Sequence, residues 1–269
     1  MRLRFRQRAF TLVEMAVVLA IVGLLLGSLM YTLSAQSDQR AREQTQRTLE
    51  QAREALLGYA VANGRLPCPA AGGATGAESP AGGGNCTNYY DGFLPAITLG
   101  FQPVDAQGYG LDAWNNRIRY AVAQNLNAAT CVGTSATPHF TAQATLKQNG
   151  MSCQPNSNDL LICKSTTSAP APVPGSCGAA DNVVTNANPS GTVVAILFSP
   201  GKNYAVAATA AAALAANKPD EAANLDGNSV FISHTLAPVG AAGGEFDDMM
   251  LWIPVGSFYG RLATAGVLP

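Results

Sequence analysis

The chain of 269 residues is long enough for one sizeable domain with appended segments. Charged residues make up 12% of it, about half of the roughly 25% typical of soluble domains, so we expect a polar but weakly charged surface. Four basic residues, Arg2, Arg4, Arg6 and Arg8, crowd the N-terminus, and the rest of the chain holds 12 basic and 17 acidic residues. This acidic balance argues against a nucleic-acid-binding domain, which would need a basic face.

An apolar stretch follows the arginines and runs from Phe10 to Leu33, with Glu14 as its only charged residue. As an α-helix rising about 1.5 Å per residue, its roughly 24 residues would span about 36 Å. The hydrocarbon core of a bilayer is about 30 Å thick, so the stretch predicts a transmembrane helix at residues 10–33. The preceding arginines predict a cytoplasmic N-terminus, because basic residues stay on that side of the membrane.

Residues 34–64 predict that the helix continues beyond the membrane. The segment contains no proline, and Leu49, Ala52, Leu56 and Ala60 recur at intervals of three or four residues. This spacing places the four apolar side chains on one face of a helix. We therefore expect a single helix of roughly 50 residues, whose outer half packs against a folded head.

Two other kinds of N-terminal segment share some of these features. A secretory signal peptide also has a basic start, but its apolar core is usually about 7–15 residues long. A plain signal anchor would leave Glu14 unexplained, because a carboxylate within a membrane costs at least about 2.5–3.5 kcal/mol. Glu14 could lie near the cytoplasmic interface and reach water, but its side chain is short for this.

Residues 8–14 read Arg-Ala-Phe-Thr-Leu-Val-Glu, and an unbroken apolar run follows. Over about 25 residues the segment resembles the processing motif of prepilins, the precursors of type IV pilins and type II secretion pseudopilins. The resemblance implies that a prepilin peptidase removes residues 1–9 as a leader, cuts between Ala9 and Phe10, and methylates the new amine of Phe10. It also implies that Glu14 attracts the N-terminal amine of a neighbouring subunit during assembly, where low dielectric strengthens a charge pair.

Two features depart from the usual family pattern. The family usually has Gly before the cut, whereas this chain has Ala9, the next smallest side chain; whether this slows cleavage is left open. Many major pilins carry a proline that kinks the helix, at a position equivalent to the neighbourhood of Tyr31, and this chain has no proline before Pro67. The missing proline and the large head favour a minor pilin or minor pseudopilin.

Residues 65–269 are expected to form a periplasmic head that begins with a Gly-rich loop up to about Gly84. All six cysteines lie in this part, and an even number on one side of a membrane favours disulfides in an oxidising compartment. None is part of a Cys-x-x-Cys pair, so a zinc ribbon has no support. Fifteen connectivities are open, with a preference for near neighbours such as Cys68–Cys86. The candidates are Cys68, Cys86, Cys131, Cys153, Cys163 and Cys177.

The sheet of the head is predicted to open near Ile118–Val122, where apolar residues alternate. The preceding segment contains Asp112 and Trp114 and resembles the Asp-x-Trp-Gly segment of pseudopilins, with Asn115 in place of the usual Gly. In that resemblance the segment marks the fold and not a catalytic site. We expect Trp114 to fill the core against the long helix.

The remaining elements are predicted in chain order. An insertion at about residues 130–188, rich in Thr, Asn and Pro, holds four of the six cysteines and is expected to be stapled by disulfides with little regular structure. The near-continuous apolar run 191–198 predicts a strand that is buried on both faces. The Ala-rich segment Ala205–Asn217 predicts a helix. Residues 229–235 and 248–252 predict two closing strands.

Asp226, Asp247 and Asp248 are weak candidates for a calcium site. The turn before Asp247 is similar to the end of the major pseudopilin head, where an acidic loop can hold calcium. Acidic residues in turns are more often solvated, and no regular ligand spacing is visible. Apart from this open question, no cofactor is expected.

Catalytic patterns are weak throughout the chain. Ser199 and Lys202 match a Ser-x-x-Lys pair, but the companion motifs of penicillin-binding enzymes are absent. His139 and His234 lie about 95 residues apart and lack an acidic or cysteine cluster, so each is expected to be an ordinary surface or sheet residue. No nucleophile, base and orienting group are found together, and we do not expect an enzyme.

These observations predict an α+β, pilin-like fold: a long N-terminal transmembrane and amphipathic helix packed on a small antiparallel β-sheet head with a disulfide-stapled insertion. The family resemblance implies a single-pass inner-membrane protein with a periplasmic head that enters a type IV pilus or a type II secretion pseudopilus. Its implied partners are prepilin peptidase, other pilins or pseudopilins, and an inner-membrane assembly platform driven by a cytoplasmic ATPase. The alternative is a membrane-anchored periplasmic binding or adhesion module that is not cleaved after Ala9 and does not enter a filament.

Overall fold

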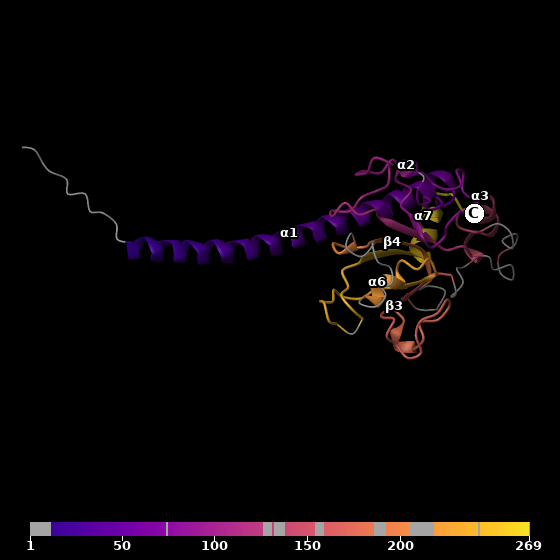
Figure 1. Ribbon diagram of the computed structural model, residues 1–269. Helices are drawn as coiled ribbons and strands as arrows, with labels where there is room; N and C mark the ends of the chain where they lie inside the picture. Colours follow the sequence, from indigo (N-terminus) through magenta and orange to yellow (C-terminus); the bar gives the residue numbers. More distant parts are fainter. Residues whose placement is uncertain are drawn as a thin grey trace, which may run out of the picture. The chain divides into compact units, whose positions relative to one another are not determined.

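A computed structural model gives the fold of the chain (Figure 1). Two compact units divide between Glu43 and Gln44, and each is described by itself. For residues 26 and 28–35 the structure describes the backbone alone. The described residues are 12–73, 75–125, 131, 138–153, 159–185, 192–204, 218–241 and 243–268.

Helix α1 runs from Leu12 to Asn63, a length of 52 residues, and confirms the long helix expected from the sequence (Figure 1). No proline interrupts it, so every turn can keep its backbone hydrogen bonds. Gly64 ends the helix in the left-handed conformation, with φ of 65°, and its backbone N–H donates to the carbonyl of Ala60 at 2.8 Å. Within the described part of the chain, no helix has both the length and the hydropathy needed to cross a membrane.

The predicted apolar face of the outer half of α1 is confirmed. Leu49, Ala52, Leu56 and Ala60 are all fully buried within the second unit. They are spaced three or four residues apart, so their side chains lie on one side of the helix and leave the charged side chains in solvent. Between Leu12 and Leu25 the apolar side chains of α1 are exposed.

A four-stranded antiparallel sheet forms the centre of the head, in the order β1-β2-β4-β6. Tyr120 on β2 pairs with Leu197 on β4, and Ile196 on β4 pairs with Trp252 on β6. Every residue of β4 is buried, as its continuous apolar sequence predicts. The strands are β1 (Gly92–Phe93), β2 (Arg119–Val122), β4 (Val193–Ser199) and β6 (Met249–Pro254).

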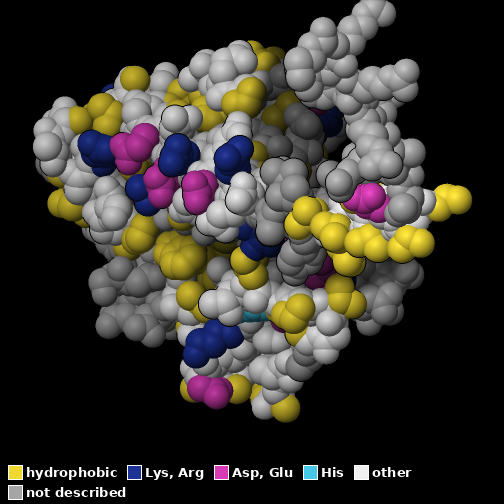
Figure 2. All heavy atoms as spheres, turned by 90° about the vertical axis from the view of Figure 1, so that its left-hand side faces the viewer, with side chains coloured by type: hydrophobic (Ala, Val, Ile, Leu, Met, Phe, Trp, Pro, Cys, Tyr) yellow, Lys and Arg dark blue, Asp and Glu magenta, His cyan; other side chains and the backbone are white. Residues whose placement is uncertain are grey.

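One hydrophobic core joins this sheet to two helices. Leu49 and Leu56 of α1, Ile196 of β4, and Phe258 and Leu262 of the C-terminal helix α7 (Val255–Thr264) all belong to it and are almost entirely buried. The head is therefore an α+β domain in which helices pack on an antiparallel sheet, as predicted. On the face shown in Figure 2, basic and acidic side chains lie beside one another amid a largely uncharged surface.

The insertion contains more regular structure than its composition predicted. Strand β3 (Leu161–Cys163) pairs in parallel with β5 (Val230–Ile232), so β5 belongs to a second, two-stranded sheet instead of the main sheet. A smaller apolar cluster joins residues of both strands to Phe246. The short helices are α2 (Ala96–Leu99), α3 (Gln143–Asn149), η1 (Gly150–Ser152), η2 (Ala180–Asn182) and α6 (Pro219–Ala223). The helix predicted at Ala205–Asn217 lies outside the described residues.

All six cysteines form disulfides, and each pair joins near neighbours in the sequence. The pairs are Cys68–Cys86, Cys131–Cys153 and Cys163–Cys177, with separations of 18, 22 and 14 residues. Two of the three close loops within the insertion, which is therefore stapled as predicted.

Candidate functional site

The processing motif lies at the start of α1. The predicted leader, residues 1–9, with Ala9 and the methylation site Phe10 lies outside the described residues. Glu14 is in the first turn of α1, and its side chain is exposed. A carboxylate in the first turn interacts favourably with the positive end of the helix dipole. The structure thus places Glu14 on a regular helix, close to its N-terminal end.

The segment around Asp112 acts as a structural clamp. The Oδ1 atom of Asp112 accepts hydrogen bonds from the backbone N–H groups of Trp114 and Asn116, at 2.9 and 2.8 Å. Its Oδ2 atom accepts a hydrogen bond from the hydroxyl of Ser199 on β4, at 2.5 Å. Burial raises the pKa of Asp112, although these hydrogen bonds oppose the shift. Trp114 is half-buried and is not among the buried core residues, so its predicted place in the core is wrong.

The weak catalytic patterns do not converge on one site. The Ser199 hydroxyl is engaged by Asp112, while Lys202 is exposed in the following turn. His139 is fully buried, which corrects the expectation of a surface or sheet residue; its Nε2 atom lies 2.9 Å from the Tyr259 hydroxyl. Burial lowers the pKa of His139 to about 4 and keeps it neutral at pH 7. His234 belongs to a different cluster, in which its ring stacks on Phe246.

Two of the three calcium candidates come together with a carboxylate that the sequence analysis did not single out. Asp247 and Asp248 precede β6, and Glu221 lies on α6. One carboxylate oxygen from each of the three lies within 4.8 Å of the others. Asp226 is not part of this group. We call Glu221, Asp247 and Asp248 the acidic cluster.

The acidic cluster brings negative charges together in a weakly solvated place. Glu221 and Asp248 are buried and Asp247 is half-buried. Burial raises the pKa of Asp247 to about 6, and the charge of Glu221 adds to the shift. Burial also raises the pKa of Asp248 well above its usual value. Lys218 compensates part of this charge, with its Nζ atom 3.5 Å from Glu221 and 2.8 Å from Glu245.

Two oxygen atoms, one in the acidic cluster and one next to it, are buried without a hydrogen-bond partner among the described residues. They are Oδ1 of Asp247 and Oδ1 of Asn203, whose Nδ2 atom donates to Glu221 at 2.9 Å. Buried polar oxygens usually have a donor or a cation nearby. Carboxylate and amide oxygens are ligands that Ca²⁺ prefers, so this set of donors fits a hard cation.

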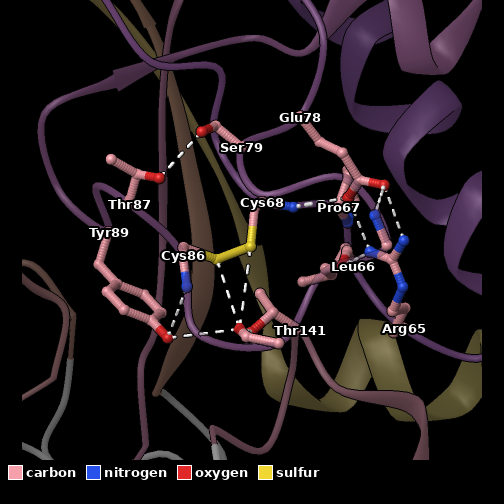
Figure 3. Close-up of a disulfide and its surroundings, with 12 residues drawn as sticks. Arg65, Leu66, Pro67, Cys68, Glu78, Ser79, Cys86, Thr87, Tyr89 and Thr141 are labelled. Carbon is pink, nitrogen blue, oxygen red and sulfur yellow. Dashed lines mark hydrogen bonds and ion pairs between the residues drawn. A yellow bond between two sulfur atoms is a disulfide. The ribbon is translucent and has the colours of Figure 1, made fainter.

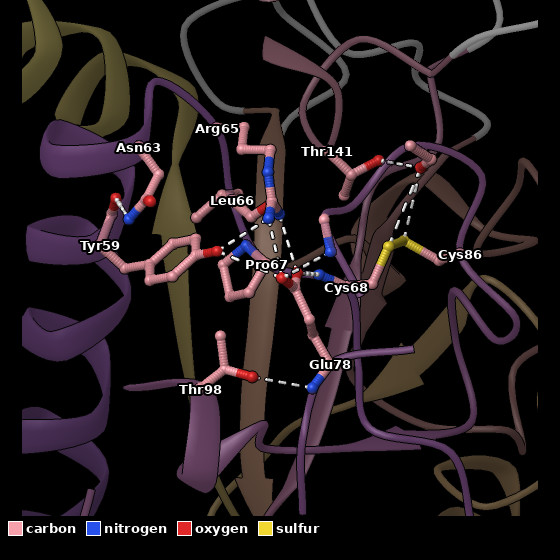
Figure 4. A network of polar contacts seen from close by, with 12 residues as sticks. Tyr59, Asn63, Arg65, Leu66, Pro67, Cys68, Glu78, Cys86, Thr98 and Thr141 are labelled. Atoms are coloured by element: carbon pink, nitrogen blue, oxygen red, sulfur yellow. Dashed lines mark hydrogen bonds and ion pairs between the residues drawn. A yellow bond between two sulfur atoms is a disulfide. The ribbon is translucent and has the colours of Figure 1, made fainter. Parts of the chain in front are cut away.

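A second polar group, the helix-end network, lies where α1 meets the head (Figure 4). It consists of Tyr59, Arg65 and Glu78. The Nη1 and Nη2 atoms of Arg65 each donate to a different carboxylate oxygen of Glu78, both at 2.8 Å, in a bidentate pair. Nη2 also lies 2.8 Å from the Tyr59 hydroxyl, and that hydroxyl donates to Glu78 at 3.3 Å.

The charges of the helix-end network compensate one another. The side chains of Arg65 and Glu78 are 9% and 8% exposed, so both charges are largely removed from water. Burial alone would raise the pKa of Glu78, but the hydrogen bonds and charge of Arg65 outweigh it, and the pKa lies below its usual value. Neither residue was singled out from the sequence, because their spacing of 13 residues across a Gly-rich loop forms no recognisable pattern.

The disulfide Cys68–Cys86 closes the loop that carries Glu78 (Figure 3). The backbone N–H of Cys68 donates to Oε2 of Glu78 at 3.2 Å, so the disulfide and the helix-end network share a residue. The backbone N–H of Gly82, within the same loop, donates to Oε1 at 3.1 Å. The Glu78 carboxylate therefore ties the two sides of the loop to the end of α1.

Comparison with known proteins identifies the N-terminal region alone. The family model of the prokaryotic N-terminal methylation motif matches residues 4–30, which contain Ala9, Phe10 and Glu14. No curated protein and no solved structure matches the chain. The matched motif is the prepilin-type sequence that resemblance alone had suggested. Residues 4–30 therefore carry the prepilin-type N-terminal methylation motif, which is typical of the pilin and pseudopilin family.

Proposed function

We propose that the chain is a structural filament subunit, a minor pilin or minor pseudopilin, that assembles into a type IV pilus or a type II secretion pseudopilus. The motif match at residues 4–30 carries the proposal, because this motif implies a pilin-like subunit processed by prepilin peptidase. The long α1 helix and the α+β head agree with it. Pilin-like proteins are usually structural and not enzymatic, and we propose no catalytic role for this chain.

The proposed organisation follows the order of the sequence. Residues 1–9 are the leader, 10–33 cross the inner membrane, and 34–64 continue the helix into the periplasm. Residues 65–269 form the head, with the insertion at about 130–188. After assembly, Glu14 pairs with the methylated amine of a neighbouring subunit, since a carboxylate in an apolar helix bundle needs a positive partner. The assembly platform and sibling pilins or pseudopilins are the proposed partners.

The uninterrupted α1 supports a minor subunit. No proline occurs along its 52 residues, so the helix lacks the residue that kinks many major pilins. The head is also large, and its insertion holds two disulfides and contributes strand β3 to a second small sheet. A subunit of this kind fits a position of low copy number, such as the tip of a filament.

The intact mass and N-terminal peptide of the protein from its native membrane test this function. We expect a chain that starts at N-methylated Phe10. A chain that starts at Met1 would indicate a plain anchor, and one that starts near Gln36 would indicate a signal peptide; either result would overturn the proposal. Ala9→Gly should be processed normally, whereas Ala9→Leu should remain uncleaved, because the site requires a small side chain.

Cross-linking in the native membrane distinguishes a filament subunit from the alternative, a membrane-anchored binding or adhesion module. A filament subunit should form cross-links to sibling pilins, and Glu14→Gln should abolish them without preventing cleavage. A binding module would show neither sibling cross-links nor a dependence on Glu14. That result would favour the alternative, in which the insertion binds a ligand or a surface.

We also propose that the acidic cluster holds a divalent cation of the calcium type. Three carboxylates within 4.8 Å of one another and the unpaired Oδ1 atoms of Asp247 and Asn203 support the proposal. The cation would be structural, linking α6 to the start of β6. Oxygen ligands from both segments would then be held at fixed distances.

A further inference from the structure

The buried charge of Arg65 depends on a loop that has little structure of its own. Arg65 directly follows Gly64 at the end of α1, and its bidentate partner Glu78 comes from residues 68–86. The described residues of this loop form turns and bends with one isolated bridge, from Ala70 to Phe93. It is also rich in glycine, which loses more conformational entropy on ordering than any other residue. Some constraint is needed to keep Glu78 in place.

The disulfide supplies that constraint at both ends of the loop. Cys68 and Cys86 are the first and last residues of the segment, and Glu78 lies between them (Figure 3). Cross-linking a loop of this size removes about 3 kcal/mol of unfolded-chain entropy. Cys68 is fully buried, and its backbone N–H itself donates to Glu78. Closing the disulfide thus positions one of the donors that hold the carboxylate.

Further contacts place the closed loop against the end of α1. The backbone N–H of Glu78 donates to the hydroxyl of Thr98 at 2.9 Å (Figure 4). The guanidinium of Arg65 also donates to the carbonyl of Leu66 at 3.1 Å and lies over the ring of Tyr59, 5.3 Å from its centroid. The last turn of α1 and the first residues after it therefore share their polar partners with the loop.

We infer that the Cys68–Cys86 pair is a redox-controlled lock that fixes the end of α1 on the head. In the reduced chain the loop can open and withdraw Glu78, which leaves Arg65 without its carboxylate. A buried charge that loses its partner is strongly destabilised, so residues 59–66 then detach from the head. Oxidation closes the loop, restores the bidentate pair and holds these residues in place. The lock extends beyond the proposed filament role and does not depend on it.

The redox step needs an external disulfide as the oxidant. The thiolate of one cysteine attacks a sulfur of the oxidant and releases one oxidant thiol; the second cysteine then attacks the mixed disulfide and releases the other. The two cysteines lose two protons and two electrons, and the oxidant is reduced to two thiols. Oxidised glutathione can serve as this oxidant in the test.

The disulfide Cys163–Cys177 provides a matched control. Cys163–Cys177 lies in the smaller apolar cluster with Phe246. The Sγ atom of Cys177 lies 3.6 Å from the carbonyl oxygen of Ile162, and among the described residues no hydrogen bond joins either cysteine to Tyr59, Arg65 or Glu78. Its loop of 14 residues is similar in length to that of Cys68–Cys86, so removing it should relax a comparable amount of chain without opening the lock.

Hydrogen exchange on the full chain in detergent micelles tests the lock. The Gly64 and Leu66 amides, which donate to Ala60 and Phe140 at 2.8 Å, report on the end of α1. In Cys68→Ala/Cys86→Ala their exchange should accelerate at least about tenfold, whereas Cys163→Ala/Cys177→Ala should change it less than about twofold. The reduced wild-type chain should behave like the first variant, and oxidised glutathione should restore protection. Equal effects of both variants, or unchanged protection in the first, would overturn the lock.

Glu78→Gln in both backgrounds shows whether the disulfide acts through the carboxylate. In the oxidised chain this substitution should accelerate exchange at Gly64 and Leu66 about tenfold; in Cys68→Ala/Cys86→Ala it should add less than about twofold. Fully additive effects would overturn the inference. A loss of protection in Cys68→Ala/Cys86→Ala that is as large across β4 as at Gly64 and Leu66 would also overturn it, because the disulfide would then be a general staple of the head.

Discussion

The helix-end network and the acidic cluster are two buried polar groups with opposite charge balance. In the first, Arg65 meets Glu78 in a bidentate pair, and the pKa of Glu78 falls below its usual value. In the second, three carboxylates share one nearby lysine, and the pKa of Asp247 rises to about 6. Burial penalises the charged form in both places, so the partner decides the direction of the shift.

The two groups also differ in how many of their carboxylate oxygens have hydrogen-bond partners. The Glu78 carboxylate accepts hydrogen bonds from Arg65, Tyr59, Cys68 and Gly82, and both of its oxygens are used. In the acidic cluster, Oδ1 of Asp247 has no hydrogen-bond partner among the described residues. Excess negative charge with an unused oxygen is what a cation site would require.

The largest expected effect is the loss of the compensated pair. Glu78→Gln should lower the free energy of unfolding by about 3–5 kcal/mol at pH 7, because it leaves the buried charge of Arg65 uncompensated. Urea unfolding of the full chain in detergent, followed by tryptophan fluorescence, measures the change. The apolar double substitution Arg65→Met/Glu78→Leu should recover most of the loss. If the single and double substitutions destabilise equally, the charge pair is not the cause.

The pH dependence of the same variant gives a further check. Because the folded pKa of Glu78 is depressed, its contribution is complete above the unfolded value of 4.5 and is lost as the pH falls through the lower folded value. The difference between wild type and Glu78→Gln should therefore shrink only below about pH 4.5.

Calcium should produce the next largest effect, by acting on the acidic cluster. At a concentration about 100 times the dissociation constant, binding to the folded state alone would add about 2.7 kcal/mol and raise the melting temperature. Chelation should reverse the shift. Asp247→Asn/Asp248→Asn should abolish it, whereas Asp226→Asn, outside the cluster, should retain it. An equal calcium shift in all three proteins would place the ion elsewhere.

A smaller effect is expected from Asp247 in calcium-free buffer. Its pKa of about 6 in the folded chain exceeds the usual 3.8, so the folded state binds more protons between these values. The free energy of unfolding should therefore fall as the pH rises from 3.8 to about 6, and then level off. Asp247→Asn should stabilise the head at pH 8 by roughly 1 kcal/mol, after allowance for solvent screening, and have little effect at pH 3.5. Chemical unfolding at both pH values measures the change in the free energy of unfolding. An equal effect of Asp247→Asn at both pH values would contradict this account.

The smallest effect should come from an exposed charge pair that joins α7 to α1, the helix of Tyr59. Arg261 on α7 pairs with Glu54 on α1, and both side chains are about half exposed. Arg261→Ala should change the free energy of unfolding by no more than about 1 kcal/mol, because water and salt screen such pairs. High salt should remove even this difference. If Arg261→Ala lowered the free energy of unfolding as much as Glu78→Gln, burial would not explain the difference between the two charge pairs.

The sequence predicted the elements that have strong local patterns. The apolar face of α1 repeats with helical spacing, and β4 is a continuous apolar run, so both were identified. Strand β5 lies within the strand predicted at residues 229–235, but β3 and its parallel pairing with β5 were missed because β3 has only three residues and its partner is distant in the sequence. Glu221 was missed for a related reason: α6 brings it to Asp247 across 26 residues, and no local spacing records such a contact.

The burial of individual side chains was hardest to anticipate. Trp114 was expected in the core because it is large and apolar, but the Asp112 clamp holds its backbone in a turn and leaves the ring half-exposed. His139 was expected in an ordinary surface or sheet position, yet it lies buried against Tyr259. Neither outcome follows from residue type alone, because both depend on which segments the tertiary fold brings together.

The β3–β5 pairing has a consequence for the order in which the head can form. Leu161 on β3 pairs with Val230 on β5, which follows it by 69 residues in the sequence. The second sheet can therefore form only when these two distant segments meet. The disulfides close loops of at most 22 residues, and a short loop closes far sooner than a long one. The cysteines can therefore form their native disulfides before β3 has paired with β5. Disulfides that form early restrict the conformations of the unfolded chain. The later, long-range strand pairing then starts from fewer alternative conformations.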